Sequence, residues 1–335
     1  MKNVFSALLV ALMLVGILTG CTNQAEMPTV TATPAGSQAE SAADEKIRIV
    51  TTIFPEYDWV REILGDKADS AEITMLLDNG VDLHSYQPTA DDLIKLSDCD
   101  LFVYVGGESD EWVEDALKSA ANRDRKVIRL LDALGDSVKE EETVEGMQEE
   151  EEDQEEKEYD EHVWLSLKNA KTLVGAISAA LQELDPGNKD TYAANADAYG
   201  QKLSALDAEY QKAVSAGTYK TLLFGDRFPF RYLVDDYGLS YYAAFAGCSA
   251  ESEASFETVS FLARKVEELK LPCVLTIEGK NHKIAETIVQ NTAGKNQKIL
   301  TMDSMQSTTS QDVANGTTYL SLMAKNLDVL KEALG

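Results

Sequence analysis

Two of the three histidines in this chain of 335 residues lie in polar loops where an imidazole can bind a metal ion. His84 stands in the segment Gly80-Val-Asp-Leu-His84-Ser-Tyr-Gln-Pro-Thr89, and His162 in Tyr159-Asp-Glu-His162-Val-Trp-Leu165. A neutral imidazole is the commonest side-chain ligand for a first-row transition metal. Either histidine alone could instead bond nearby backbone or be a surface group with a raised pKa. The third, His282, lies near lysines, and we assign it no metal role.

Three carboxylates in the second half of the chain stand where expected strands end. Asp226, Glu278 and Asp303 each follow such a strand closely. In open parallel sheets, ligands bind beyond the carboxyl ends of the strands. We therefore predict a cleft site for a divalent transition metal, with two imidazoles from the first half and carboxylates from the second. An aspartate at a strand end is also a common helix N-cap, so Asp303 alone decides nothing.

The elements that position these residues alternate between short apolar strands and helices. In the first half the expected strands are Ile47–Ile53, Ile73–Leu77, Leu101–Val105 and Val127–Leu131. Helices are expected from Pro55, after the N-cap Thr89, and around Trp112. Strands that are apolar throughout and alternate with helices indicate a parallel sheet covered on both faces.

The second half repeats this rhythm without a clear sequence repeat. Its expected strands are Thr221–Phe224, Leu239–Phe245, Val274–Ile277 and Lys298–Thr301. Its expected helices are Phe230–Asp236, Phe256–Leu269, Ile284–Asn291 and Thr317–Leu334. The predicted fold class is α/β, with two lobes that each hold a four-stranded parallel sheet flanked by helices.

A long helical segment separates the two halves. Between Asp190 and Ala216 the chain is rich in alanine, has no internal proline, and carries one stripe of larger side chains: Tyr192, Ala196, Tyr199, Leu203, Leu206 and Tyr210. At 1.5 Å per residue this helix would be about 40 Å long, which suits a rigid connection between lobes. The predicted domains are a first lobe at 46–186, a linking helix at 187–216 and a second lobe at 217–335.

The first 45 residues are expected to lie outside the fold. Residues 1–21 have a positive start and a short apolar run, as in a signal peptide. Their ending, Leu18-Thr-Gly-Cys21, resembles the bacterial lipobox, which implies that Cys21 is lipidated and becomes the mature N-terminus; an ordinary secretory peptide is the alternative. Residues 22–45 suit a flexible tether.

The formal charge of −28 argues against nucleic acid and against an anionic bilayer surface as partners. Much of this charge lies in an expected insertion at 139–161, where residues 140–161 hold fourteen acidic residues and one lysine. Runs of this kind are usually solvated and disordered. Exposed carboxylates hold divalent cations loosely, so a role in collecting metal ions is a hypothesis.

Cysteines other than Cys21 show no zinc-knuckle or Cys-x-x-Cys spacing. They are Cys99, Cys248 and Cys273, and an odd number predicts no disulfide framework. As a soft ligand Cys248 would favour zinc, although a small buried thiol is the role that we expect for it.

The two histidine segments and the strand Asp100-Leu-Phe-Val-Tyr resemble the zinc and manganese branch of the solute-binding lipoproteins of bacterial ABC importers. The resemblance covers Ile47 to Leu334, although Leu83 replaces the usual proline of the first segment and Glu161 that of the second. It implies that His84 and His162 are metal ligands and that Asp303, in Thr301-Met-Asp303, matches an aspartate that the family often uses as a ligand.

Arg227 is a departure from this family at the position of its third ligand. Members have a histidine or glutamate there, whereas a protonated arginine cannot bind a cation. Asp226 and Glu278 are the candidates to replace it. In the alternative interpretation Arg227 pairs with one of these two carboxylates, and neither touches the metal.

The resemblance implies an extracytoplasmic, lipid-anchored binding protein at the cell membrane that is not an enzyme. It would capture Zn²⁺, or alternatively Mn²⁺, between its lobes as a monomer and deliver the ion to an ABC permease driven by its ATPase. A metal-dependent hydrolase of the envelope is a second hypothesis, since it needs the same ligands with an open position and a general base. An adhesin is a third, as a further role of the same protein.

Overall fold

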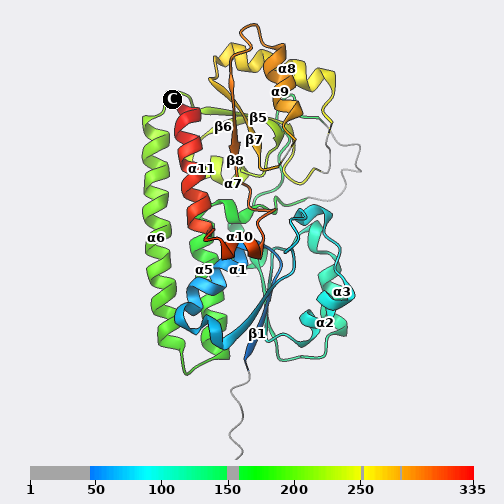
Figure 1. Cartoon of the computed structure of the whole chain (residues 1–335), viewed down its shortest axis with the longest axis vertical. Helices are drawn as coiled ribbons and strands as arrows, with labels where there is room; N and C mark the ends of the chain where they lie inside the picture. The colour runs from blue at the N-terminus through cyan, green and yellow to red at the C-terminus, as the bar shows by residue number, and fades with distance from the viewer. Residues whose placement is uncertain (1–45, 149–157, 250–252, 280) are drawn as a thin grey trace, which may run out of the picture. The chain divides into compact units, whose positions relative to one another are not determined.

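Two four-stranded parallel sheets carry the fold in the computed structural model, which describes residues 46–148, 158–249, 253–279 and 281–335 (Figure 1). The first sheet has the order β2-β1-β3-β4, and its strands are β1 (Ile47–Thr51), β2 (Ala71–Met75), β3 (Leu101–Tyr104) and β4 (Lys126–Arg129). The second has the order β6-β5-β7-β8, with β5 (Thr221–Arg227), β6 (Ser240–Phe245), β7 (Cys273–Ile277) and β8 (Lys298–Met302). The predicted α/β fold class is confirmed. The expected signal peptide, Cys21 and the tether lie outside the described residues.

Helices flank both sheets. Those of the first half are α1 (Phe54–Leu64), α2 (Ala90–Asp98), α3 (Trp112–Ser119), α4 (Leu130–Leu134) and α5 (Leu167–Leu184). The long α6 (Lys189–Ala216) follows, and then α7 (Arg231–Tyr237), α8 (Phe256–Leu269), α9 (Lys283–Asn291), α10 (Ser310–Ala314) and α11 (Tyr319–Leu334). Short 3₁₀ helices occur at Gly65–Ser70, Leu83–Ser85, Glu108–Asp110, Gly135–Ser137 and Val163–Leu165.

The eight expected strands are all present, but the four strands of the first half end one or two residues earlier than the apolar runs indicated. The run Val127–Leu131 divides, because β4 ends at Arg129 and Leu130 and Leu131 begin the buried face of α4. Helix α10 was not expected from the sequence. It is a single short turn, begun by reciprocal capping between Thr309 and Asp312.

Local hydrogen bonds determine the shape of the loop that carries His84. The side chain of Asp82 accepts the backbone N–H of His84, and Leu83 is buried beneath the turn. Thr89 and Asp92 form a capping box at the start of α2, as the sequence predicted for Thr89. Both ends of the His84 loop are therefore held before any ligand binds.

Helix α6 is a shared support for both halves of residues 45–335, which form one compact unit. It has 28 residues and is therefore about 42 Å long. It contacts α1 and α5 of the first half and α11, which packs on β8 of the second (Figure 1). Tyr210 on its predicted stripe is buried and donates a hydrogen bond to the carbonyl of Met323. The boundaries at 186 and 216 stay predictions, because the two sheets share this helical layer.

The acidic run, whose composition is typical of a solvated segment, packs in part on the protein within its described stretches, 140–148 and 158–161. Met147 is buried, and Gln148 donates its backbone N–H to the carbonyl of Ala244 beside β6. Glu142 pairs with Arg231 on α7 at 3.1 Å. Apolar side chains within the run and cations on the second half therefore hold these parts against the protein. Residues 149–157 lie outside the described residues.

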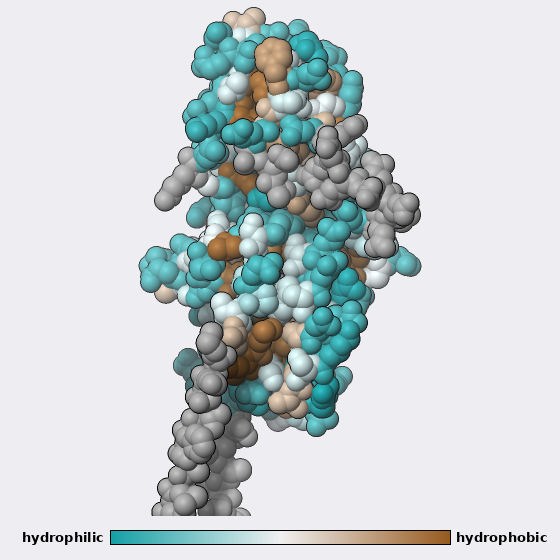
Figure 2. Space-filling view, turned by 90° about the vertical axis from the view of Figure 1, so that its right-hand side faces the viewer, coloured by the Kyte–Doolittle hydropathy of each residue, from teal (hydrophilic) through white to brown (hydrophobic). Residues whose placement is uncertain are grey.

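The face in Figure 2 is mostly hydrophilic, and its hydrophobic areas are small and separate. Among the described residues, the large apolar side chains that are exposed include Leu93, Ile94, Val127, Tyr159 and Phe256. None of the described helices is long and apolar enough to cross a membrane. Cys99, Cys248 and Cys273 carry free thiols.

Asp58 on α1 makes a buried contact that predicts a dependence of stability on pH. Its Oδ2 accepts the backbone N–H of Tyr319 at the start of α11, and the side chain is 3% exposed. Burial raises the pKa of Asp58 to about 6. The native state thus binds this proton more tightly than the unfolded chain does. The contribution of the group to the free energy of unfolding is greatest below about pH 4 and falls as the pH rises towards 6.

We expect Asp58→Asn to raise the free energy of unfolding by about 1–3 kcal/mol at about pH 8, because it keeps an acceptor for Tyr319 and removes a buried charge. The gain should disappear near pH 4. Urea unfolding of both proteins across this range measures the difference. The exposed Asp91→Asn is the matched control, with a change below about 0.5 kcal/mol. A difference for Asp58→Asn that does not vary with pH would contradict the assignment.

Candidate metal centre

The imidazoles of His84 and His162 face each other in the interior. Their Nε2 atoms are 3.2 Å apart. The side chain of His84 is 8% exposed, and His162 is fully buried. His84 lies on the 3₁₀ helix after β2, and His162 directly precedes the 3₁₀ helix Val163–Leu165. The structure thus brings together the two histidines that the sequence singled out.

The segment of His162 is held by contacts with the second half. The indole of Trp164 is fully buried and donates a hydrogen bond to the carbonyl of Ser304, just after β8. Tyr319 donates its hydroxyl to the carbonyl of Trp164. A Cβ on Gly247, in the loop after β6, would lie 3.2 Å from the ring of His162 and 2.9 Å from the carbonyl of Phe228. Only a glycine lets that loop approach the imidazole this closely.

Each imidazole has a partner at Nδ1, away from the other ring. His162 Nδ1 is 3.0 Å from Asp160 Oδ1, and His84 Nδ1 is 2.8 Å from Ser109 Oγ. A carboxylate accepts only, so His162 carries its proton on Nδ1 and presents an unprotonated Nε2. Donation from His84 Nδ1 to Ser109 gives the same result there. This pattern of outer hydrogen bonds is typical of histidines that bind a metal.

The charge state of the pair follows from its surroundings. Burial and the neighbouring His162 lower the pKa of His84 to about 3, so this ring is neutral at neutral pH. Burial also acts to lower the pKa of His162, but the charge and hydrogen bond of Asp160 and the charge of Glu161 outweigh it and raise the pKa. The pair therefore lies in a buried, acidic environment, which favours a cation between the rings.

The separation of the two Nε2 atoms suits a tetrahedral metal ion. With Zn–N bonds of about 2.0–2.1 Å, two ligand nitrogens at a tetrahedral angle are about 3.3 Å apart. The observed distance is 3.2 Å. Both imidazoles can thus bind one ion with little movement of either ring.

Cys248 is the third residue near the pair. Its Sγ and ring nitrogens of His84 and His162 all lie within 4.8 Å of one another. Burial and the nearby Glu141 and Asp160 raise the pKa of the thiol, so it carries its proton when no cation is near. Cys248 is partly buried, whereas a small buried thiol was expected, and the sequence did not predict that it lies beside both imidazoles.

The three predicted carboxylates are outside this group of ligand atoms in the described part of the chain. Asp226 accepts the backbone N–H groups of Arg227 and Ile277. Glu278 accepts the backbone N–H and the hydroxyl of Ser304.

Asp303 accepts the backbone N–H of Met305. Its own backbone N–H donates to the side chain of Asn326 on α11. Burial and the charge of Glu278 raise the pKa of Asp303 to about 6. The hydrogen bonds of all three carboxylates therefore shape the loops at the ends of β5, β7 and β8.

Arg227 pairs across the cleft with a residue that the sequence analysis did not consider. Its Nη2 lies 2.5 Å from Oδ2 of Asp82, the residue that also holds the His84 turn. Nη1 of Arg227 donates to the carbonyl of Ser249 at 3.3 Å. Arg227 therefore forms its hydrogen-bonded ion pair with Asp82. Asp226 and Glu278, its partners in the alternative interpretation, attract it only through their charges.

Four further residues around the imidazoles were missed as functional candidates: Ser109, Asp160, Glu161 and Gln306. Asp160 and Glu161 directly precede His162, so their position next to the histidine could have indicated that they interact with its ring. Nothing in the sequence pointed to Ser109 or Gln306, which come from distant loops. Gln306 Nε2 is 3.4 Å from His162 Nε2, and its buried Oε1 has no hydrogen-bond partner.

Two pockets of the described residues are candidates for a ligand site, and only one of them reaches an imidazole. The first is a cleft of about 330 Å³, lined by Asp82 and His84 from the first half and by Asp226, Arg227 and Glu278 from the second. It reaches His84 from between the halves, whereas His162 is fully buried behind it.

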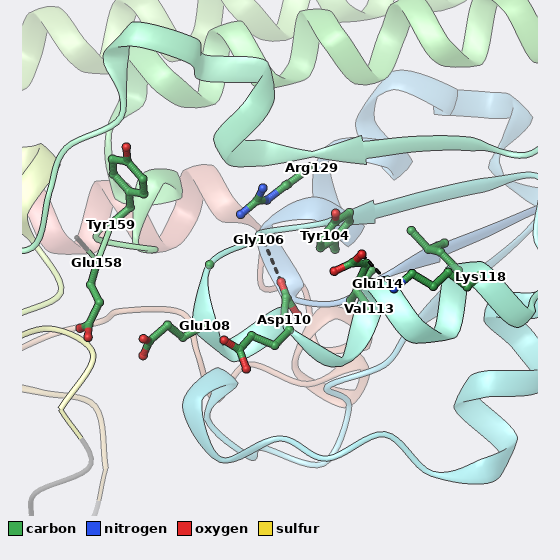
Figure 3. Close-up of a pocket in the computed structure, with 13 residues that line it drawn as sticks. Tyr104, Gly106, Glu108, Asp110, Val113, Glu114, Lys118, Arg129, Glu158 and Tyr159 are labelled. Atoms are coloured by element: carbon green, nitrogen blue, oxygen red, sulfur yellow. Dashed lines mark hydrogen bonds and ion pairs between the residues drawn. The ribbon is translucent and has the colours of Figure 1, made fainter. Parts of the chain in front are cut away.

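The second pocket, of about 890 Å³, lies beyond the ends of β3 and β4 (Figure 3). Glu108, Asp110 and Glu158 lie along it, together with Arg129. Its lining has no imidazole or thiol, the donors that suit Zn²⁺ and related transition metals. The imidazole pair, rather than this larger pocket, is therefore the candidate metal centre.

Two parallel α/β halves around a buried pair of imidazoles are the features of a two-lobed metal-binding protein. Residues 49–333 match the model of the family described as zinc-uptake complex component A, periplasmic (ZnuA), and the chain belongs to this family.

Relatives of known sequence and structure agree with this assignment. The chain is 32% identical over 299 residues to the zinc-binding lipoprotein AdcA of Streptococcus pneumoniae, covering 88% of this chain and 57% of AdcA, so it spans just over half of that relative. It is 29% identical to the high-affinity zinc uptake system protein ZnuA of Bacillus subtilis, covering 89% and 92%. The crystal structure of the Zn(II)-bound ZnuA-like domain of AdcA superimposes with a TM-score of 0.67 at 31% identity, covering 86% and 99%.

We expect Asp160→Asn to weaken the binding of Zn²⁺ by about 10- to 100-fold, because the amide no longer holds the His162 proton on Nδ1 by charge. Isothermal titration with Zn²⁺ measures the change. Asp235→Asn, at an exposed carboxylate that pairs with Lys139, is the control and should leave the affinity unchanged. Equal affinity of Asp160→Asn and the parent protein would show that Asp160 has no influence on the site.

Proposed function

We propose that this protein captures Zn²⁺ between its two halves at the extracytoplasmic side of the cell membrane. The observation that carries this proposal is the pair of buried imidazoles, whose Nε2 atoms are 3.2 Å apart with outer partners on both Nδ1 atoms. His84 and His162 are the proposed primary ligands. Asp303, Asp226 and Glu278 remain proposed carboxylate ligands, which would have to exchange their present hydrogen bonds for the metal.

Zinc is favoured over manganese by the chemistry of the donors. Imidazole nitrogen suits Zn²⁺, whereas Mn²⁺ prefers a shell of oxygen ligands. The names of the relatives, zinc-binding lipoprotein and high-affinity zinc uptake system protein, support the same choice. Manganese remains the alternative, which a histidine pair with carboxylates could also bind.

The proposed partners are an ABC permease and its ATPase, to which the loaded protein delivers the ion as a monomer. Support comes from the family description, which names a component of a zinc-uptake complex. The proposed location is the extracytoplasmic face of the membrane, held by a lipid on Cys21 and by the tether at 22–45. Several relatives are named lipoproteins, which supports the anchor.

The contacts of α6 with helices of both halves limit how far the halves can separate. Release of the ion is therefore expected through a small tilt of the halves and movement of their loops. The Arg227–Asp82 pair crosses the cleft and would have to break during such a movement.

The protein is proposed to act as a carrier and not as an enzyme. A hydrolase would use the same two histidines, so turnover is the property that separates the two hypotheses. Esterase and phosphatase activity of the Zn²⁺-loaded protein, lost in His84→Ala, would overturn the carrier assignment in favour of the envelope hydrolase.

We expect His84→Ala to weaken the binding of Zn²⁺ by more than about 100-fold, because it removes one of two buried nitrogen ligands. Calorimetry and native mass spectrometry of residues 22–335 with Zn²⁺ and with Mn²⁺ measure affinity and stoichiometry. His282, whose Nδ1 bonds the hydroxyl of Thr276 at 2.7 Å, supplies the matched control His282→Ala. A His84→Ala protein that binds as tightly as the parent would refute the proposed site.

The carboxylates are tested in the same way by Asp303→Ala, Asp226→Ala and Glu278→Ala. A ligand should lose affinity for both metals, whereas a residue that only shapes its loop should change stability more than affinity. Circular dichroism and thermal unfolding of each variant separate these outcomes.

The acidic run is proposed to concentrate cations near the cleft. A deletion of residues 149–157 tests this role, because it keeps the residues of the run that pack on the second half. If this deletion leaves both Zn²⁺ affinity and uptake into cells unchanged, the segment is a spacer.

A further inference from the structure

Cys248 stands beside the imidazole pair on the loop that follows β6. Its backbone N–H donates to Glu141 Oε1 at 2.9 Å, and the next residue, Ser249, accepts Nη1 of Arg227 at 3.3 Å. Gly247, the preceding residue, lies against the ring of His162. Three contacts from different parts of the chain thus hold this loop over the two histidines.

Arg227 cannot be a metal ligand, because its side chain carries a positive charge. Its guanidinium is always protonated, and Asp82 neutralises it across the cleft. The arginine therefore supplies no ligand of its own to a cation between the imidazoles. It also holds Ser249, and so positions the thiol of the preceding residue.

We propose that Cys248 is a ligand of the captured ion, completing a centre with two nitrogens and one sulfur, and that it selects zinc over manganese. The inference rests on the proposed function and adds a ligand to its site. When Zn²⁺ enters, the Cys248 S–H bond breaks, a Zn–S bond forms and the thiol proton leaves to solvent. No electron is transferred, and the ion stays divalent.

The geometry permits this coordination with a small movement. In a tetrahedral zinc site with a Zn–S bond of about 2.3 Å and a Zn–N bond of about 2.0–2.1 Å, sulfur and nitrogen are about 3.6 Å apart. The three ligand atoms here lie within 4.8 Å of one another. A shift of the thiol by roughly 1 Å closes the remaining gap, which a change of side-chain rotamer provides.

The chemical consequence is selectivity. Thiolate is a soft ligand that Zn²⁺ accepts readily, whereas Mn²⁺ prefers carboxylate, carbonyl and water oxygens. The two histidines alone discriminate less sharply, because either metal accepts imidazole. The buried Oε1 of Gln306, which has no partner, is near enough to His162 to fill a fourth position after a rotation of its amide.

The test uses Co²⁺ as a spectroscopic substitute for Zn²⁺, because a thiolate bound to Co²⁺ produces an intense charge-transfer absorption in the near ultraviolet. Residues 22–335 are titrated with Co²⁺ as the parent protein and as Cys248→Ser. We expect the band in the parent and its loss in the variant. Cys273→Ser is the matched control, because that thiol is buried at the start of β7, and it should keep the band.

Competition calorimetry gives the second measurement. Cys248→Ser should weaken Zn²⁺ binding by on the order of 100-fold and Mn²⁺ binding by less than about 3-fold, since only the softer metal gains from sulfur. Equal losses for both metals would overturn the selectivity. Circular dichroism confirms that the variant is folded.

The result separates this inference from the proposed function. If the parent binds Zn²⁺ and His84→Ala does not, but no charge-transfer band appears or the band survives in Cys248→Ser, then the histidine site stands and Cys248 is not a ligand. If His84→Ala binds as tightly as the parent, the proposed site itself is wrong, and the inference falls with it.

Discussion

The central constraint of this structure is the close approach of two buried imidazoles. The Nε2 atoms of His84 and His162 lie 3.2 Å apart, and His162 is fully buried. Two unprotonated nitrogens at this distance repel each other through their lone pairs unless a proton or a cation lies between them. The protein sets up this condition from outside the pair, because Asp160 and Ser109 occupy the Nδ1 atoms. The capped turn at Asp82 and the buried Trp164 then hold the two loops in place. The fold thus orients both imidazoles for a cation before the ion binds.

The side chains around the pair connect the two halves of the chain. Arg227 and Asp82 form an ion pair from opposite sides of the cleft, and Trp164 bonds a carbonyl just after β8. Helix α6 supports helices of both halves at the same time. A protein that must bind and then release an ion needs such contacts to be few and specific. Each of these contacts joins the two halves, and under the proposed release mechanism each would have to be exchanged when the halves tilt.

The acidic run combines two roles that its composition alone does not separate. Glu141 bonds the loop of Cys248, and Gln148 continues the hydrogen bonding beside β6. Glu141 thus contacts the loop beside the imidazoles, although the sequence around it is typical of a solvated segment. A charged run can therefore pack on the fold in part when it contains a few apolar residues, such as Met147, whose side chains become buried.

The sequence by itself determined all eight strands and most of the helices, and it singled out the two imidazoles. Apolar strands alternating with amphipathic helices have a strong local signal, and a histidine in a strand-end loop can be recognised without coordinates. Only the tertiary structure decided what stands around the imidazoles. Cys248 and Gln306 come from loops that are distant in the chain. The ion pair between Arg227 and Asp82 forms only because the two halves pack together. Local patterns carry no information on such contacts, because they depend on the path of the whole chain and not on the residues next to them.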